Sequence, residues 1–198
     1  AMTPNVLLAN VASPFKSLSE LIQMARSKPG ELNFGSTSLG GSPHMSGELL
    51  KSLAKIDMVH VPYKGGAPML VDLIGGQVPF AFDNLPSSIQ HIRSGKVRAL
   101  AVTTTKRWPG APEIPTLQES FPQAAGTLET IIAVMAPAGT PTAVVQRLDR
   151  AIQDALARNE TQARFQALNT AVLPLNAEQL TRRIASDNPN WESLMKKA

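Results

Sequence analysis

The chain has 198 residues, of which 43% are hydrophobic and 17% are charged, a balance that favours a packed core over disorder. The net charge of +4 is dispersed and there is a single tyrosine, so the sequence predicts no nucleic-acid partner. The absence of cysteine excludes disulfide bonds and thiolate metal sites.

Segments typical of strands and of helices alternate along the chain. The predicted strands are 5–11, 31–34, 58–62, 78–82, 97–103, 130–136 and 171–174. The predicted helices are 17–27, 42–54, 67–74, 87–94, 140–158, 161–168 and 177–186, and Pro189 is expected to break or kink the last one. This alternation predicts an α/β fold with a mainly parallel sheet flanked by helices.

A proline-rich segment, 106–127, interrupts the alternation and predicts an irregular connection between two units. The longest apolar run, Ile131–Ala136, is too short to span a membrane, and no segment has the pattern of a signal peptide. A strand begins almost at the first residue, which suggests that the natural sequence extends further upstream.

The segment 33–47 predicts a strand, a loop of glycine and hydroxyl residues, and a helix with Ser42 as its N-cap and Pro43 as its first residue. Such a loop directs amide groups and a helix N-terminus at one place, which favours an anion. It resembles a nucleotide P-loop, but Gly41 stands where the P-loop lysine would be. The pattern therefore favours a small carboxylate over a triphosphate, although an ordinary strand–loop–helix connection has the same composition.

Two further strand–loop–helix junctions follow. Tyr63–Gly66 includes Lys64, which either offsets a ligand's negative charge or is a plain surface lysine. Asp83 follows another strand and either accepts a hydrogen bond from a ligand or caps the next helix with Asn84. Because ligands bind at the carboxyl ends of strands in open α/β sheets, the three junctions together predict a site.

A hydrolase or transferase is the main alternative, with Ser38 or Ser42 as the nucleophile, His44 as the base, and Asp72 or Asp83 as its partner. The spacing of Gly35, Ser38 and Gly40 does not satisfy the nucleophile-elbow pattern, because the first glycine is one residue too early. His44 is instead predicted to donate a hydrogen bond to a ligand or to the loop. The three histidines lack metal-site spacing, and His60 is expected to face solvent, so neither a metal nor a cofactor is predicted.

Several motifs together resemble the Bug family, the substrate-binding receptors of tripartite tricarboxylate transporters. They are Gly35-Ser36, Gly40–Leu49, Val61–Pro68, Gly75–Val78, Phe82–Pro86, Gly95–Val102, Pro112–Thr116 and Ala136–Pro141. The resemblance covers nearly the whole chain. Position 79 is a mild departure, because an acidic residue is more usual there in the family than Pro79.

The resemblance implies a periplasmic, non-enzymatic binding protein of two lobes that close around a small carboxylate and deliver it to transporter membrane subunits. It implies a type II periplasmic-binding-protein lobe at 4–125 and a C-terminal remnant of the other lobe at 126–198, with the N-terminal part of that lobe missing. The ligand-binding residues carried over from the family are Ser36, Thr37, Ser38, Gly40, Gly41, Ser42, His44, Tyr63 and Asp83. The unpartnered apolar faces of the C-terminal segment then predict a homo-oligomer or swapped dimer.

Overall fold

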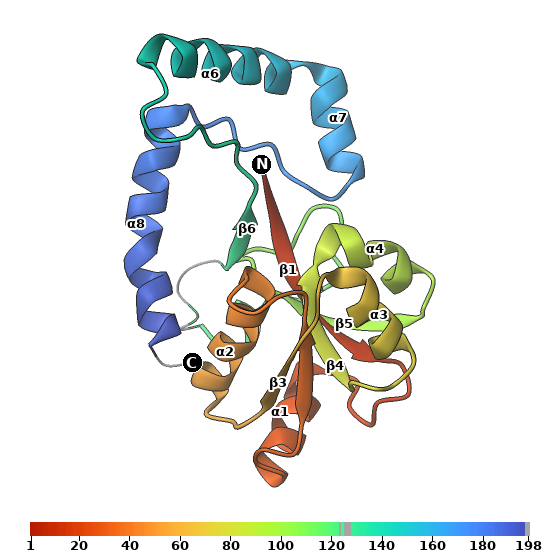
Figure 1. Ribbon diagram of the computed structural model, residues 1–198. Coiled ribbons are helices and arrows are strands. Elements are labelled where there is room, and N and C mark those ends of the chain that lie inside the picture. The colour runs from red at the N-terminus through yellow and green to blue at the C-terminus, as the bar shows by residue number, and fades with distance from the viewer. Residues whose placement is uncertain (123, 125–127, 197–198) are drawn as a thin grey trace.

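The computed structural model describes residues 1–122, 124 and 128–196, which form an α/β body with a smaller helical region above it (Figure 1). The strands are β1 (Met2–Asn10), β2 (Asn33–Ser36), β3 (Val59–Pro62), β4 (Phe80–Asn84), β5 (Val97–Val102) and β6 (Glu129–Ile131). The helices are α1 (Leu18–Ser27), α2 (Ser42–Ala54), α3 (Gly66–Ile74), α4 (Leu85–Arg93), α5 (Leu117–Ser120), α6 (Thr142–Ala157), α7 (Asn159–Ala167) and α8 (Ala177–Met195).

The sheet has the strand order β3-β2-β4-β1-β5, and β6 pairs with β1 outside this path. β2 is parallel to both β3 and β4, whereas β1 is antiparallel to β4 and to β5. Four strands therefore share one direction and β1 opposes them. The prediction of a mainly parallel sheet is confirmed, and the carboxyl ends of β2, β3 and β4 lie at the same edge.

The core lies on both faces of this sheet. Alternate residues of β1 face opposite sides: Leu7 packs with α1 and α2, and Val6 and Leu8 pack with α3 and α4. Because both faces are covered, β1 reads as a continuous apolar run rather than as an alternation of apolar and polar residues.

The upper region consists of α6, α7 and part of α8, reached through β1 and β6 (Figure 1). No residue of α6 or α7 is buried. α8 returns along the side of the molecule and contacts α2. Within the described ranges, no helix is long and apolar enough to cross a membrane.

Three predictions for the C-terminal half are wrong. The last helix continues past Pro189 to Met195, so the predicted break at this proline is not present. The strand predicted at 130–136 pairs only over Glu129–Ile131. The strand predicted at 171–174 is reduced to one bridge, between Ala171 and Met2.

Other boundaries shift by a few residues. α4 begins at Leu85 rather than at residue 87, and α6 begins at Thr142, with Pro141 at its N-cap position. The connection predicted as irregular contains the short helix α5, which a reciprocal capping box between Thr116 and Glu119 stabilises. Residues 123 and 125–127 of that connection lie outside the described residues.

Candidate functional site

The three junctions singled out in the sequence meet at one edge of the sheet. The amide of Tyr63 donates to the Ser36 carbonyl at 2.9 Å, and the amide of Gly65 donates to the Thr37 carbonyl at 2.9 Å. Gly66, at the start of α3, lies against Asp83, whose carboxylate oxygen would be 3.3 Å from a Cβ atom at that glycine. The parallel arrangement of β2, β3 and β4 produces this convergence.

The N-terminus of α2 carries no side-chain cap. Gly41 is the N-cap residue and Ser42 is the first helical residue, so the prediction of Ser42 as the cap is wrong by one position. The amides of Gly41, Ser42 and His44 therefore have no acceptor inside the helix, and Pro43 has no amide to offer. These donors lie at the positive end of a 13-residue helix, where they favour an anion.

The Ser42 hydroxyl is used elsewhere. It contacts the Thr130 hydroxyl and lies 3.4 Å from Asn5 Oδ1. The buried Asn5 amide is the centre of a wider network: it donates to Ser46 Oγ at 3.0 Å and accepts from Asn84 Nδ2 at 2.8 Å. The network joins β1, α2 and β4 to the chain leading into the upper region, and sequence reasoning missed it. A buried amide in an apolar strand was the available signal.

The loop between β2 and α2 presents small residues. Thr37 is half-buried, while Ser38 and Gly40 are exposed. Gly40 has a φ of +72°, which favours glycine there. A Cβ atom at Gly41 would overlap the Ser38 hydroxyl, so a larger residue at position 41 requires that hydroxyl to move.

Two histidines lie beneath this loop. His44 Nδ1 accepts a hydrogen bond from the Gly40 amide at 3.0 Å, so the ring accepts from the loop rather than donating to it as predicted. The prediction that His60 faces solvent is also wrong. Its ring stacks on that of His44 with centroids 3.8 Å apart, and its Nε2 lies 2.7 Å from the Oγ of the buried Ser36.

Tyr63 and Asp83 both engage groups of the protein. The Tyr63 hydroxyl donates to Asp72 Oδ2 at 2.9 Å, and burial together with this carboxylate raises the pKa of Tyr63 to about 12. Asp83 accepts from the Asn84 amide and from the hydroxyls of Ser87 and Ser88, so its side chain anchors the start of α4. Burial raises the pKa of Asp83 although all three hydrogen bonds oppose that change.

Formal charge close to the loop is largely compensated. Glu48, on α2, is buried and forms an ion pair with Lys51 at 2.9 Å. Lys64 is exposed beside the second junction. Neutral amide and hydroxyl donors therefore dominate this edge, which suits a small carboxylate better than a polyphosphate with its magnesium.

Comparison with known proteins agrees with this chemistry. The family described as "Tripartite tricarboxylate transporter family receptor" matches residues 1–198. The chain belongs to this receptor family. One curated member, BugT of Bordetella pertussis, is 34% identical over 196 residues, which are 98% of the chain and 59% of BugT. The chain therefore spans less than two thirds of the length of that relative.

Solved structures of the receptor family have the same fold. Rhodopseudomonas palustris Rpa4515 with adipate matches with a TM-score of 0.91 and 34% identity, over 100% of this chain and 66% of that one. Periplasmic binding protein BugD matches with a TM-score of 0.84 and 31% identity, over 99% of this chain and 66% of BugD. MatC (Rpa3494) from Rhodopseudomonas palustris with bound malate matches with a TM-score of 0.83 and 29% identity, over 98% of this chain and 66% of MatC.

Proposed function

We propose that the α/β body is the ligand-loop lobe of a periplasmic solute-binding receptor for a small organic carboxylate. The observation that carries this proposal is the α2 N-terminus without a side-chain cap, which faces a loop of small residues at the edge where three strand–helix junctions converge. The adipate and malate in the titles of two solved relatives support a dicarboxylate as the ligand class. We also propose that the receptor delivers this ligand to a tripartite tricarboxylate-type membrane transporter, which the family assignment supports.

The predicted ligand residues fall into two groups, those at the surface of the loop and those whose side chains are bonded to other protein groups. Thr37, Ser38 and Gly41 offer amides and hydroxyls at the surface of the loop, and we propose that they and the Ser42 amide contact the carboxylate. Gly40 provides the turn. The remaining residues of the predicted set act behind this surface, since their side chains are bonded to other protein groups: Ser36, His44, Tyr63 and Asp83.

The division into two parts stays a proposal. Residues 4–125 carry the sheet and both core clusters, whereas residues 126–198 contribute β6, the exposed helices α6 and α7, and α8. We propose that the second part belongs to the other lobe of the receptor. This part has few buried side chains, as expected for helices whose packing partner is another part of the receptor.

The hydrolase alternative is poorly supported by the geometry. The serine–histidine contact at this edge is Ser36 with His60, and Ser36 is fully buried and donates to the Ser38 carbonyl at 3.0 Å. The pKa of His60 is lowered to about 4, mainly by burial, which makes the ring a weak base. A buried hydroxyl with a weak base suits a structural role better than nucleophilic catalysis.

Isothermal titration calorimetry with adipate, malate and citrate tests the proposal, with ATP and magnesium as a matched anion control. We expect at least one carboxylate to bind with one-to-one stoichiometry. Its dissociation constant should be about millimolar, because these residues supply one side of a ligand clamp. Binding of ATP with magnesium more tightly than any carboxylate would refute the assignment, and so would turnover of ester substrates that is lost in Ser38→Ala, Ser42→Ala or His44→Ala.

A further inference from the structure

Two of the three histidines in the chain stack directly beneath the ligand loop. His44 comes from the first turn of α2 and His60 from β3, and their rings are 3.8 Å apart at 22°. The Phe34 ring packs on His60 with centroids 5.0 Å apart. The His44 side chain is only 12% exposed. The two stacked rings are thus semi-buried, and neither contact with a carboxylate nor catalysis explains why two histidines lie there.

Each ring holds a different part of the loop. His44 Nδ1 accepts from the Gly40 amide. His60 Nε2 meets Ser36 Oγ, and Ser36 donates its single proton to the Ser38 carbonyl. Ser36 must therefore accept from a proton on His60 Nε2. The His44 contact requires a neutral ring, because it needs a lone pair on Nδ1. The His60 contact needs a proton on Nε2, which both the neutral tautomer and the charged ring supply.

Burial and Lys51 favour the neutral form of both rings, and Glu48 opposes it at His44. Glu48 faces His44 Nε2 at 3.6 Å, but Lys51 forms an ion pair with the same carboxylate. Burial is the largest cause that lowers the pKa of His44, Lys51 acts in the same direction, and Glu48 opposes them. Burial, the neighbouring His44 and Lys51 lower the pKa of His60 to about 4. At neutral pH both rings are therefore uncharged.

We propose that His44 and His60 are positioning residues that brace the segment Ser38–Gly40, and that protonation of His44 releases it, so that carboxylate affinity falls with acidification. A proton on His44 Nδ1 would face the Gly40 amide proton, and that hydrogen bond would be lost. A second charge in the stacked ring would add repulsion. This inference rests on the proposed function for its ligand, but not for the movement of the loop.

The loop can be tested without any ligand. Amide and imidazole ¹⁵N chemical shifts of the full chain would be followed by NMR from about pH 8 to about pH 4.5. We expect the His44 tautomer with its proton on Nε2 at neutral pH. The Gly40 amide should shift, and its protection from hydrogen exchange should fall relative to the intrinsic rate at each pH, with a midpoint below the ordinary histidine value of 6.5. The proposal is overturned if the Gly40 amide is unaffected while His44 titrates.

Matched variants separate the effect of histidine protonation on the loop from other effects of low pH on the protein. His44→Asn places an acceptor near the Nδ1 position, and His60→Gln places a donor near the Nε2 position, but neither residue titrates in this range. The double variant should keep the loop closed at acid pH. His91→Gln, on α4, is the control and should titrate like the unmodified chain. Loop opening at the same pH in the double variant would refute the proposal.

Calorimetry with malate then connects the loop to binding. We expect malate affinity to fall by at least about threefold more in the unmodified chain than in the double variant between about pH 7.5 and about pH 5. Because both proteins are titrated with the same malate, ionisation of the ligand changes both affinities equally and cancels in their comparison. A malate affinity that rises on acidification only in the unmodified chain would contradict the proposed role of His44 and His60. Failure of malate to bind at any pH, with normal loop titration, would instead count against the proposed function.

Discussion

At the residue scale, glycine at position 41 decides how closely the loop approaches the helix. A Cβ atom there would overlap Ser38 Oγ, yet the backbone of Gly41 has a φ of −75° that any residue adopts. The restriction at this position is therefore steric contact with one side chain. This separates its role from that of Gly40, whose φ of +72° restricts the backbone itself.

Gly41→Ala should weaken carboxylate binding by about tenfold, because the displaced loop no longer aims its amides at one place. Calorimetry with adipate measures the change, and thermal unfolding should show little loss of stability. The double variant Ser38→Ala with Gly41→Ala removes the overlapping hydroxyl and should bind more tightly than Gly41→Ala, but less tightly than the unmodified chain because the Ser38 hydroxyl is itself a proposed ligand contact. Equal binding by Gly41→Ala and the unmodified chain would contradict this role for the loop.

The same scale explains why polar residues lie inside the lobe. Asn5, fully buried in β1, forms hydrogen bonds with groups from α2, β4 and the start of β6. Asp83 supports three donors at the start of α4. Buried polar groups are tolerated when they are bonded, and these two fix the elements that carry the site.

At the element scale, Gly47 allows α2 to pack directly against the Phe34 ring of the sheet. A Cβ atom at this position would overlap the Phe34 ring, which is fully buried in β2. The contact sets the height of α2 above the sheet, and with it the position of the helix N-terminus at the ligand loop.

Gly47→Ala should destabilise the lobe by about 2 kcal/mol, because an extra methyl group forces either the helix or the aromatic ring to move. Urea denaturation followed by circular dichroism measures the change. Ser52→Ala, on the exposed side of the same helix, is the control and should alter stability by less than about 0.5 kcal/mol. Comparable stabilities for the two variants would exclude close packing at Gly47.

α8 contains Pro189 and nevertheless runs from Ala177 to Met195. Proline removes the hydrogen bond to the carbonyl four residues earlier and crowds that turn. Pro189→Ala should therefore raise stability, by up to about 3 kcal/mol if α8 unfolds with the rest of the chain. Thermal unfolding and helix content report the effect, with Ala185→Gly as a destabilising control. A loss of helix content in Pro189→Ala would show that the proline is required for the path of α8.

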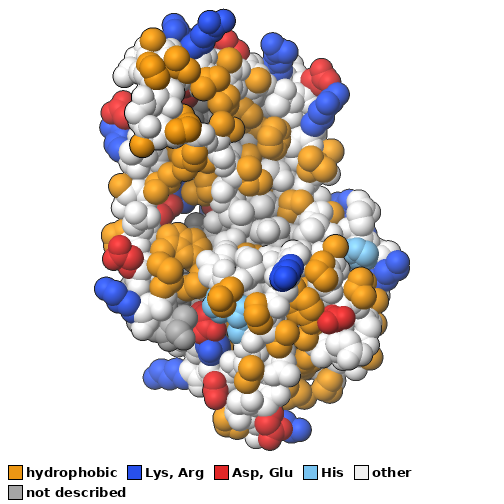
Figure 2. Space-filling model, viewed as in Figure 1, with side chains coloured by type: hydrophobic (Ala, Val, Ile, Leu, Met, Phe, Trp, Pro, Cys, Tyr) orange, Lys and Arg blue, Asp and Glu red, His pale blue; other side chains and the backbone are white. Residues whose placement is uncertain are grey.

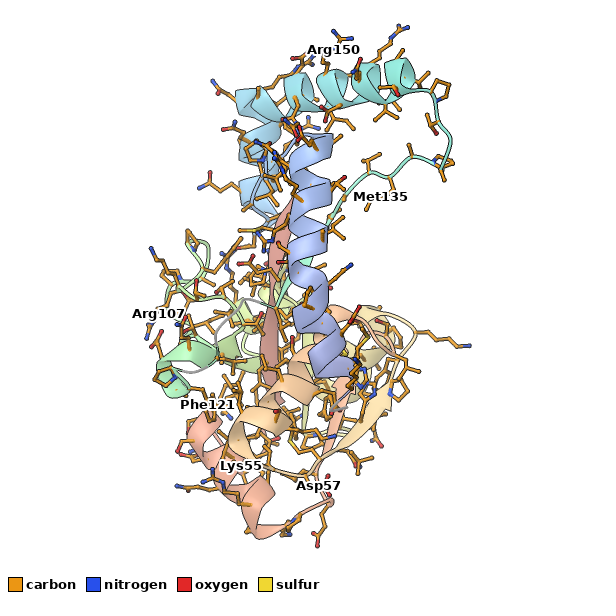
Figure 3. The ribbon with its side chains drawn as sticks, turned by 90° about the vertical axis from the view of Figure 1, so that its left-hand side faces the viewer. Lys55, Asp57, Arg107, Phe121, Met135 and Arg150 are labelled. Atoms are coloured by element: carbon orange, nitrogen blue, oxygen red, sulfur yellow. The ribbon has the colours of Figure 1, made fainter. Side chains whose placement is uncertain are left out.

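At the scale of the whole molecule, the upper region leaves apolar side chains uncovered. Figure 2 shows hydrophobic side chains gathered there, and Figure 3 shows Met135 on the connection below α6 and Arg150 on its outer side. The large apolar residues exposed in this part of the chain are Ile132, Val134, Met135, Val144, Leu148 and Leu168. A patch of this kind marks an interaction surface.

We expect the 198 residues to self-associate through this surface. Light scattering across a dilution series should show the average mass rising with concentration, and Leu148→Glu should raise the midpoint concentration by about tenfold. Arg150→Ala, on the outer side of α6, is the matched control and should leave the midpoint unchanged. A monomer at every concentration would show that the exposed face does not bind a second copy.

The motifs of the sequence carry the resemblance to the receptor family. The sequence by itself also determined the alternation of strands and helices, the direction of most strands and the three junctions of the site. These are local or periodic properties, set by apolar spacing and by glycine, proline and hydroxyl residues at element ends. Only the tertiary structure decided that Ser42 bonds across to Thr130 rather than capping α2, that His60 lies under His44, and that Asp83 turns toward α4. The Asp83 contacts lie within its own junction, and the structure selects one of the two roles that the sequence left open. The other two contacts join separate segments, as with Ser42 and Thr130, which are 88 residues apart, and the pattern within one segment does not specify which distant group will contact it.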